Sequence, residues 1–379
     1  MKRQLLGVAA ILLSISTYAQ DNPLWMRYCA ISPDGTTIAF TYKGDIYTVP
    51  STGGRASQIT TNPAHDTKPI WSPDGKKIAF ASDRMGSMDI FEVNKEGGIP
   101  KRLTTHSGNE TPVAYKDAGH ILFLANIMPT VEDAQFPSGQ FQQVYEVNTE
   151  GGRPALFSSM PMEDISINHT GNTLLYHDKK GYEDPWRKHH TSSITRDIWL
   201  CSLNGNRTFR KQTTFNGEDR TPVWASDDKS FYYLSEEKGS FNIFKRDIDG
   251  NTSKQITNHT KHPVRFLSAA SNGTLCYGYD GEIYTVKEGA IPQKVQISIV
   301  TDKNDKDLIR QIKRSGATEI SLSPDAKEIA FVLRGDVYVT STEYSTTKQI
   351  TNTPQQERDI HFSPDGRSIV YALSLIHIS

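Results

Sequence analysis

The segment "YEDPWRKHH", Tyr182 to His190, holds the densest group of side chains that could do chemistry. Arg187 and Lys188 could hold a carboxylate, such as the end of a peptide, because guanidinium and ammonium groups both bind carboxylates. The two adjacent histidines could bind a metal ion, but neighbouring side chains point apart and the sequence indicates no third ligand. The alternative is a loop that packs Trp186 on its own sheet and leaves its charges in solvent.

Arg187 and Lys188 are therefore our candidate substrate-binding residues, and we predict no catalytic, cofactor-binding or metal-binding residues. The chain has no Gly-x-Ser-x-Gly elbow, no His-Glu-x-x-His helix and no phosphate-binding glycine loop followed by Lys and Ser or Thr. Catalytic triads can also assemble from distant positions, which such motifs do not detect. Whether the chain belongs to an enzyme is left open at this point.

The elements that must position this loop are encoded by a repeated phrase. It reads "ISPDGTTIAFTYKGDIYTV" from Ile31, "WSPDGKKIAFASDRMGSMDIFEV" from Trp71 and "LSPDAKEIAFVLRGDVYV" from Leu322. Pro presets the second position of a tight turn, Gly accepts a positive φ, and the flanking β-branched and aromatic residues favour strands. With the threonine-rich strand that follows, each phrase predicts a four-stranded antiparallel meander of about forty residues, the length of a β-propeller blade.

Counting these units predicts an all-β domain organisation. Residues 21–300 hold six units, which predicts a six-bladed β-propeller of four-stranded antiparallel blades. Residues 301–316 form a charged connector, either a short helix or an extended segment. Residues 317–379 resume the phrase and predict the first one to two blades of a second, truncated propeller. A single eight-bladed ring is the alternative.

Two of the units carry long insertions between their second and third strands, and one insertion contains the segment that ends at His190. Loops held by a rigid scaffold are where binding commonly occurs. The aspartates of the turns are expected to accept hydrogen bonds from the turn's own backbone rather than to bind calcium. The large aromatic residues expected to pack between blades are Tyr47, Trp71, Phe91, Tyr145, Trp199, Phe244 and Tyr284.

The overall charge and the cysteines exclude some classes of protein. The chain has 379 residues, with 42 Lys and Arg against 43 Asp and Glu, for a net charge of −1. Nucleic-acid binding favours a basic surface, so no nucleic-acid partner is expected. Cys29, Cys201 and Cys276 are widely spaced, which indicates buried thiols rather than a disulfide framework.

The first twenty residues predict a secretory signal peptide. Lys2 and Arg3 precede an apolar run over 5–15, and small residues end the segment near Ala19. The run is shorter than the roughly 20 residues that a membrane-spanning helix needs. No later stretch could span a bilayer, so we expect an exported protein, periplasmic or secreted, with residues 1–20 removed.

Taken in order, these parts resemble the amino-terminal part of bacterial tricorn protease homologues, with TolB-like β-propeller repeats. The resemblance is carried by "WSPDGKKIAFASDR" and by the order of signal peptide, six blades, connector and "SGATEISLSPDAKEIAFVLRGDVYV". It covers the chain from the end of the signal peptide to Ala372. Single "SPDG" repeats are also found in TolB and in prolyl oligopeptidase relatives.

The resemblance implies a non-catalytic, substrate-gating and peptide-channelling propeller region of an exported tricorn-like serine peptidase. Its implied partners are unfolded peptides or oligopeptides, the PDZ-like and peptidase domains that would follow in a longer chain, and further copies in a homo-oligomer. It implies no cofactor, and the family's catalytic residues belong to the peptidase domain. The alternative is a TolB-like periplasmic propeller that binds another protein; a third is the propeller of a prolyl oligopeptidase relative.

Overall fold

The computed structural model describes residues 23–127, 141–182, 184, 192–300, 314–353 and 355–374. The described secondary structure consists of β-strands, which confirms the all-β fold class. Within these ranges, no helix has the length and apolar character needed to cross a membrane. The chain divides into two compact units, residues 1–300 and residues 301–379.

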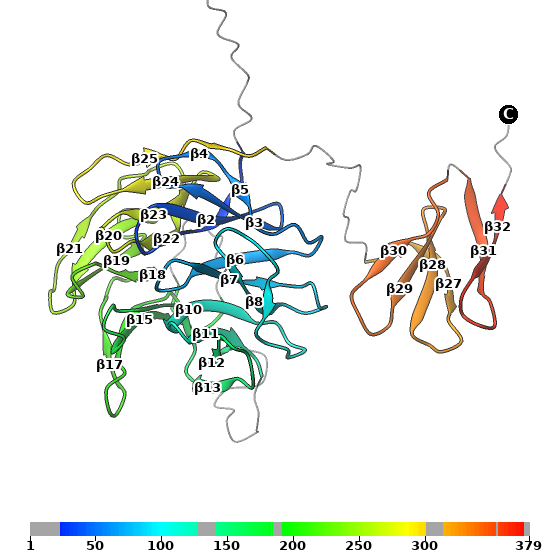
Figure 1. Cartoon of the computed structure of the whole chain (residues 1–379), viewed down its shortest axis with the longest axis horizontal. Coiled ribbons are helices and arrows are strands. Elements are labelled where there is room, and N and C mark those ends of the chain that lie inside the picture. Colours follow the sequence, from blue (N-terminus) through cyan, green and yellow to red (C-terminus); the bar gives the residue numbers. More distant parts are fainter. Residues whose placement is uncertain are drawn as a thin grey trace, which may run out of the picture. The chain divides into compact units, whose positions relative to one another are not determined.

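In the first unit the described strands form six four-stranded antiparallel sheets, each in meander order (Figure 1). The first sheet contains β1 (Arg27–Ile31), β2 (Thr37–Tyr42), β3 (Asp45–Pro50) and β5 (Ser57–Gln58). The second contains β6 (Asp66–Trp71), β7 (Lys77–Ser82), β8 (Asp89–Asn94) and β9 (Lys101–Arg102). The third contains β10 (Thr111–Asp117), β11 (His120–Ala125), β12 (Gln143–Asn148) and β13 (Ala155–Ser158).

The remaining three sheets of this unit repeat the same plan. The fourth contains β14 (Met162–Ile167), β15 (Thr173–Asp178), β16 (Ile198–Ser202) and β17 (Thr208–Lys211). The fifth contains β18 (Asp219–Trp224), β19 (Ser230–Ser235), β20 (Asn242–Asp247) and β21 (Ser253–Gln255). The sixth contains β22 (Arg265–Ala269), β23 (Leu275–Tyr279), β24 (Glu282–Val286) and β25 (Gln293–Lys294).

Burial explains the amino-acid pattern within a sheet. The second strand lies between two neighbouring sheets, so both of its faces are buried and its apolar residues run almost without interruption. In β7, Ile78, Ala79 and Phe80 are 0% exposed. The outermost strand β17 is exposed along its whole length. Of the aromatic residues predicted to pack between sheets, the structure buries five: Tyr47, Trp71, Phe91, Tyr145 and Phe244. The other two, Trp199 and Tyr284, are half-buried and pack against two further core clusters of the ring.

The repeated turn is held by its own aspartate, as expected. Asp34 Oδ1 accepts hydrogen bonds from Ser32 Oγ at 2.6 Å and from the Thr36 backbone N–H at 3.0 Å. These two hydrogen bonds lower the pKa of Asp34. Gly35 completes the turn with a φ of +77°, which glycine adopts without steric cost. The Ser–Asp contact recurs in the pairs Ser72–Asp74, Ser323–Asp325 and Ser363–Asp365.

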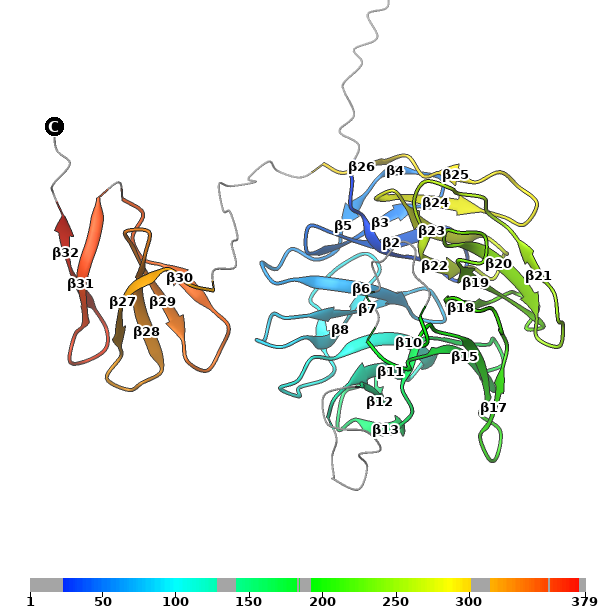
Figure 2. The same ribbon diagram turned by 180° about the vertical axis from the view of Figure 1, so that it is seen from behind.

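The six sheets of the first unit form a closed ring. The innermost strands β1, β6, β10, β14, β18 and β22 contact one another in that order, and β22 contacts β1. The yellow end of the ring accordingly lies beside its blue beginning (Figure 1 and Figure 2). The backbone N–H of Ile31 donates to Ser268 Oγ at 3.0 Å across this junction. Beyond the sixth sheet, β26 (Ile297–Ser298) pairs in parallel with β4 (Gly54–Arg55) and ties the two ends together.

The second unit contains a four-stranded sheet and a two-stranded sheet. The first consists of β27 (Ala317–Leu322), β28 (Glu328–Leu333), β29 (Asp336–Ser341) and β30 (Thr347–Gln349). The second consists of β31 (Gln356–Phe362) and β32 (Ile369–Ser374). Ala330, Val332 and Val337 of the larger sheet form a small core with Ile360 of β31. The predicted signal peptide and most of the predicted connector lie outside the described residues.

Buried carboxyl groups recur where one sheet of the ring meets the next. Burial, followed by the charge of Asp89, raises the pKa of Glu110 to about 7. Burial, with a further contribution from Asp197, raises the pKa of Asp219 to about 7. The side chains of Glu110 and Asp219 are 0% and 1% exposed. Both groups therefore take up a proton in the folded ring at a pH where they are ionised in the unfolded chain.

Glu110→Gln is expected to stabilise the ring at alkaline pH. An unfolded glutamate titrates near about 4.3, so the stabilisation that comes from protonated Glu110 is complete below that pH. It is lost as the pH rises through about 7, where the folded side chain ionises. At pH 8 the variant should exceed the parent in free energy of unfolding by on the order of 2 kcal/mol, and at pH 4 the two should be equal. Urea denaturation at both pH values measures the difference.

Glu96→Gln is the matched control, because Glu96 lies on the surface with its side chain 74% exposed. This substitution should leave the pH dependence of unfolding unchanged. A parent protein and a Glu110→Gln variant with the same dependence on pH would contradict the assignment of a protonated Glu110.

Candidate functional site

A cavity of about 650 Å³ lies at the centre of the ring. All six innermost strands contribute to its wall, so the residues that line it come from positions that are far apart in the sequence. A site at the convergence of repeated elements can combine side chains that no single repeat carries. The cavity is therefore a place where this fold can hold a ligand.

Each innermost strand carries at least one residue more than the strand beside it. In β1, Arg27 pairs with Thr41 and Ala30 pairs with Ala39, so three steps along β1 match two steps along β2. The same shift occurs in β6, β14, β18 and β22, and a similar one occurs in β10. Such a shift is a β-bulge, which bends the strand and redirects a side chain.

One residue of each bulge points into the cavity. In five of the innermost strands this residue has a positive φ: Tyr28 (53°), Lys68 (54°), Asp164 (47°), Thr221 (52°) and Phe266 (57°). Val113 takes the corresponding position in β10. All six side chains line the cavity, and we call them the bulge ring. A left-handed conformation costs a non-glycine residue about 1–2 kcal/mol, so the surrounding sheets must hold it in place.

The bulge ring is aromatic and cationic on one side. The rings of Tyr28 and Phe266, from the first and sixth sheets, lie 4.8 Å apart between centroids. The Lys68 ammonium lies 5.8 Å from the centroid of the Tyr28 ring, within range of a cation–π interaction. Burial lowers the pKa of Lys68, against the opposing charges of Asp164 and Glu163.

Arginines occupy the position just before the bulge residue in three consecutive sheets. They are Arg27 in β1, Arg220 in β18 and Arg265 in β22. Arg220 is 7% exposed, and burial lowers its pKa to about 10. Its guanidinium also lies 4.1 Å from the centroid of the Phe241 ring. Burial likewise lowers the pKa of Arg265.

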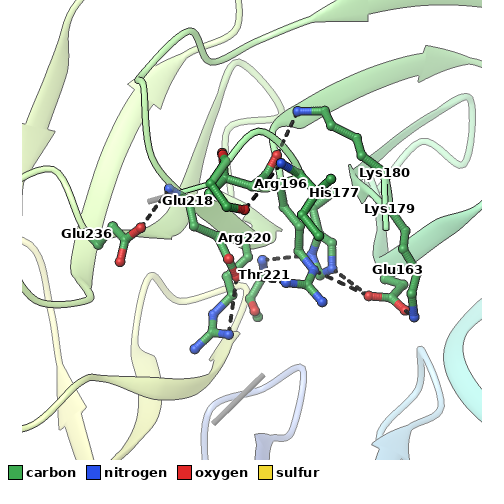
Figure 3. Close-up of polar contacts among 12 residues, drawn as sticks. Glu163, His177, Lys179, Lys180, Arg196, Glu218, Arg220, Thr221 and Glu236 are labelled. Atoms are coloured by element: carbon green, nitrogen blue, oxygen red, sulfur yellow. Dashed lines mark hydrogen bonds and ion pairs between the residues drawn. The ribbon is translucent and has the colours of Figure 1, made fainter. Parts of the chain in front are cut away.

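A network of ion pairs joins residues of the fourth and fifth sheets (Figure 3). Glu163 of β14 contacts Lys179 Nζ at 2.6 Å, His177 Nε2 at 3.2 Å and Arg196 Nε at 3.5 Å. Burial by itself would raise the pKa of Glu163, but the hydrogen bond and charge of His177, together with Lys179, hold this pKa well below its usual range. Arg196 extends the network to Glu218 at 3.1 Å. Glu163 is therefore a fixed carboxylate rather than a proton donor.

His177 is oriented from both sides. The backbone N–H of Thr221 donates to His177 Nδ1 at 3.3 Å, so in the neutral ring the proton is on Nε2, which faces Glu163. The Thr221 hydroxyl donates to Asp164 Oδ2 at 2.6 Å. Between described residues, no serine hydroxyl or cysteine thiol is hydrogen bonded to a histidine ring. The described residues of the cavity can bind and orient a ligand, and they lack the nucleophile–base contact of acyl-transfer chemistry.

The sequence-based candidates Arg187 and Lys188 lie outside the described residues. Their loop leaves the fourth sheet after β15 and returns at β16, and Lys179, Tyr182 and Arg196 on its two flanks line the cavity. The bulge ring was not predicted. In the sequence these residues lie within the first three positions of each innermost strand, and no glycine stands there to mark a positive φ.

A family model and related protein sequences both match this chain. The profile of the tricorn protease N-terminal beta propeller domain matches residues 23–290. "Tricorn protease homolog 1" of Streptomyces coelicolor is 25% identical over 339 residues, which cover 88% of this chain and 30% of that protein. "Tricorn protease homolog" of Saccharolobus solfataricus is 26% identical over 296 residues, which cover 74% of this chain and 26% of that protein.

A solved structure is similar as well. The crystal structure of the tricorn protease matches with a TM-score of 0.62 and 19% sequence identity, covering 90% of this chain and 33% of that one. At this level of identity the similarity shows the fold. The chain spans about a third or less of the length of these relatives.

Proposed function

The chain belongs to the tricorn protease N-terminal β-propeller family, and on this premise we propose that its ring is a non-catalytic gate that channels unfolded peptides to a serine-type peptidase domain. The proposal is carried by the cavity of about 650 Å³ that the six innermost strands enclose. A folded domain of about 100 residues has a radius of gyration of about 13 Å and is too large for this space. An extended peptide, whose backbone is one strand wide, can enter it.

The loop with Arg187 and Lys188 belongs to this proposal as a contact for the incoming peptide. Support comes from its flanks, because Lys179 and Arg196 line the cavity where the loop leaves and returns. Arg187→Ala combined with Lys188→Ala should then weaken the binding of an unstructured peptide. Unchanged affinity would show that the loop does not contact the peptide, and it would not count against the channel itself.

Narrowing the cavity is the direct test of the gate. Val113→Trp adds bulk to the bulge ring at the position in β10 where φ is not positive. We expect it to weaken the binding of an unstructured peptide to the purified chain at least about tenfold, because the peptide and the indole ring would compete for one space. Isothermal titration calorimetry measures the affinity, and the same peptide should remain uncleaved.

Thr208→Trp is the matched control, since Thr208 lies on the exposed outer strand β17. It should bind the peptide as the parent does. Equal affinity of the parent, the control and Val113→Trp would exclude passage through the ring. Hydrolysis of the peptide by the purified chain would show that the chain is catalytic.

We also propose that the chain is exported, with residues 1–20 removed. Support comes from the basic start, the apolar run and the small residues near Ala19. Expression in a bacterial host followed by amino-terminal sequencing of the periplasmic fraction tests this. A protein that retains Met1 and stays in the cytoplasm would contradict it.

A further inference from the structure

The side chains of the cavity carry an excess of positive charge. The basic residues that line it are Lys68, Lys179, Arg196, Arg220 and Arg265, and the acidic ones are Glu163 and Asp164. Both acidic side chains are engaged within the wall, Glu163 by Lys179 at 2.6 Å and Asp164 by the hydroxyl of Thr221 at 2.6 Å. Behind the wall, Glu218 is shared by Arg196 at 3.1 Å and Arg220 at 3.4 Å. Cations therefore outnumber carboxylates even when Glu218 is counted.

The excess is concentrated on one side by the repeat itself. Arg220, Arg265 and Arg27 precede the bulge residue in β18, β22 and β1, and Lys68 is the bulge residue of β6. These four strands are consecutive around the ring. We call the four residues the cationic arc; three of them, Arg220, Arg265 and Lys68, line the cavity. The next two innermost strands present Val113 and the acidic pair at the same level instead.

Neighbouring arginines of the cationic arc repel one another. Burial is the largest cause of the lowered pKa of Arg220 and of Arg265. The charges of Arg265 and Arg196 lower the pKa of Arg220 further, and the charge of Arg27 lowers that of Arg265. The charge of Glu218 acts in the opposite direction on Arg220, as the charge of Asp184 does on Arg265. An anion placed among these cations would relieve the repulsion.

Lys68 is the member best placed to contact a ligand. Its side chain is half-buried at the cavity wall, and between described residues its ammonium makes a cation–π contact with Tyr28 but no ion pair, although the charges of Asp164 and Glu163 act to raise its pKa. A carboxylate is a stronger partner than an aromatic face for a partly desolvated ammonium. The adjoining wall contains Pro69, Ile70 and Phe266, which offer apolar surface to a peptide chain.

We propose that the cationic arc binds carboxylate side chains of extended peptides, so that the channel selects acidic segments over neutral and basic ones. This inference rests on the proposed function and specifies its substrate class. The apolar surface and aromatic pair beside the arc favour a peptide over a small inorganic anion. Arg220, Arg265 and Lys68 line the same cavity from three different sheets, so one extended strand inside it would pass all three.

The test compares blocked peptides of about twelve residues that differ only in charge, acetylated and amidated at their ends. One peptide has Glu at alternate positions, the second has Gln and the third has Lys. At low salt the purified chain should bind the Glu peptide about tenfold more tightly than the Gln peptide, and the preference should shrink as salt screens the charges. Isothermal titration calorimetry gives both affinities.

Lys68→Gln should reduce the preference for Glu over Gln to about threefold, while Lys68→Arg, which keeps the charge, should retain it. Neither substitution introduces a β-branched side chain at the position of positive φ, so the backbone strain is similar in both. Lys76→Gln, on a turn where the lysine side chain is 77% exposed, is the matched control and should have no effect. A fourth peptide, with Gln and a free terminal carboxylate, separates side-chain from chain-end recognition.

Each result bears on the inference. Equal affinity for the Glu and Gln peptides, or a preference that survives Lys68→Gln unchanged, would overturn it. If the fourth peptide alone matched the Glu peptide, the arc would be a site for chain ends and the side-chain assignment would be wrong. Equal binding of all peptides would contradict the preference for acidic segments and leave the channel proposal standing. Binding of none of the peptides would contradict both the preference and the channel.

Discussion

Phe80→Ala is expected to lower the free energy of unfolding by about 3–5 kcal/mol, since it removes a buried aromatic ring and leaves a cavity. Phe80 lies in the middle of β7 and is 0% exposed. It belongs to a core cluster that joins Ile46 of the first sheet to Trp71 and Phe91 of the second. The Arg84 guanidinium also lies 5.5 Å from the centroid of the Phe80 ring. The substitution therefore weakens the contact between two sheets as well as the core of one.

Guanidinium denaturation followed by tryptophan fluorescence and by circular dichroism measures this loss. Phe209→Ala is the matched control, because Phe209 is 39% exposed on the outer strand β17 and its removal should change stability by less than about 1 kcal/mol. A loss below about 1 kcal/mol for Phe80→Ala would mean that the ring does not depend on packing between these two sheets.

Arg196→Met is expected to cost about 3 kcal/mol, because it leaves buried carboxylates with fewer partners. Arg196 is 5% exposed and contacts Glu218, which is 0% exposed, at 3.1 Å. It also contacts Glu163 at 3.5 Å. The methionine side chain fills part of the same volume, so the loss reports on charge more than on packing. Chemical denaturation of the parent and the variant at one pH measures it.

Two further variants distinguish an electrostatic loss from a general one. Adding Glu218→Gln to Arg196→Met removes the charge that was left behind and should recover part of the stability. Arg210→Met breaks an exposed pair, in which Arg210 and Asp249 lie 2.8 Å apart, and should cost less than about 1 kcal/mol. If Glu218→Gln costs as much stability in the Arg196→Met variant as it does in the parent, the two residues are not coupled.

Much of the architecture could be predicted from sequence because it depends on local patterns. The Ser–Pro–Asp–Gly turn is stabilised by contacts within a few residues, as between Ser32 and Asp34. The second strand of each unit is apolar because both of its faces are buried, as at Phe80. The free, buried state of Cys29, Cys201 and Cys276 was predicted from their spacing and is confirmed.

The residues that line the cavity could not be predicted in the same way, because they come from six separate units. Arg187 and Lys188 stand out because they are adjacent in sequence, whereas the residues of the cationic arc are separated by tens of positions. Lys68 and Arg265 each look like a single charge at the start of a strand. Their shared level in the cavity becomes visible only when the register of each innermost strand is known.

The sequence by itself determined the repeating sheet, since turn chemistry and strand burial act over a few residues and are written in every unit. The tertiary structure alone decided which side chains meet at the centre. The reason is that a bulge shifts register by one residue and redirects a side chain, as it does at Tyr28 and Thr221, and this geometry is imposed by neighbouring strands rather than by the residue itself. Closure of the ring, where β22 meets β1, then brings Phe266 and Tyr28 together from opposite ends of the first unit.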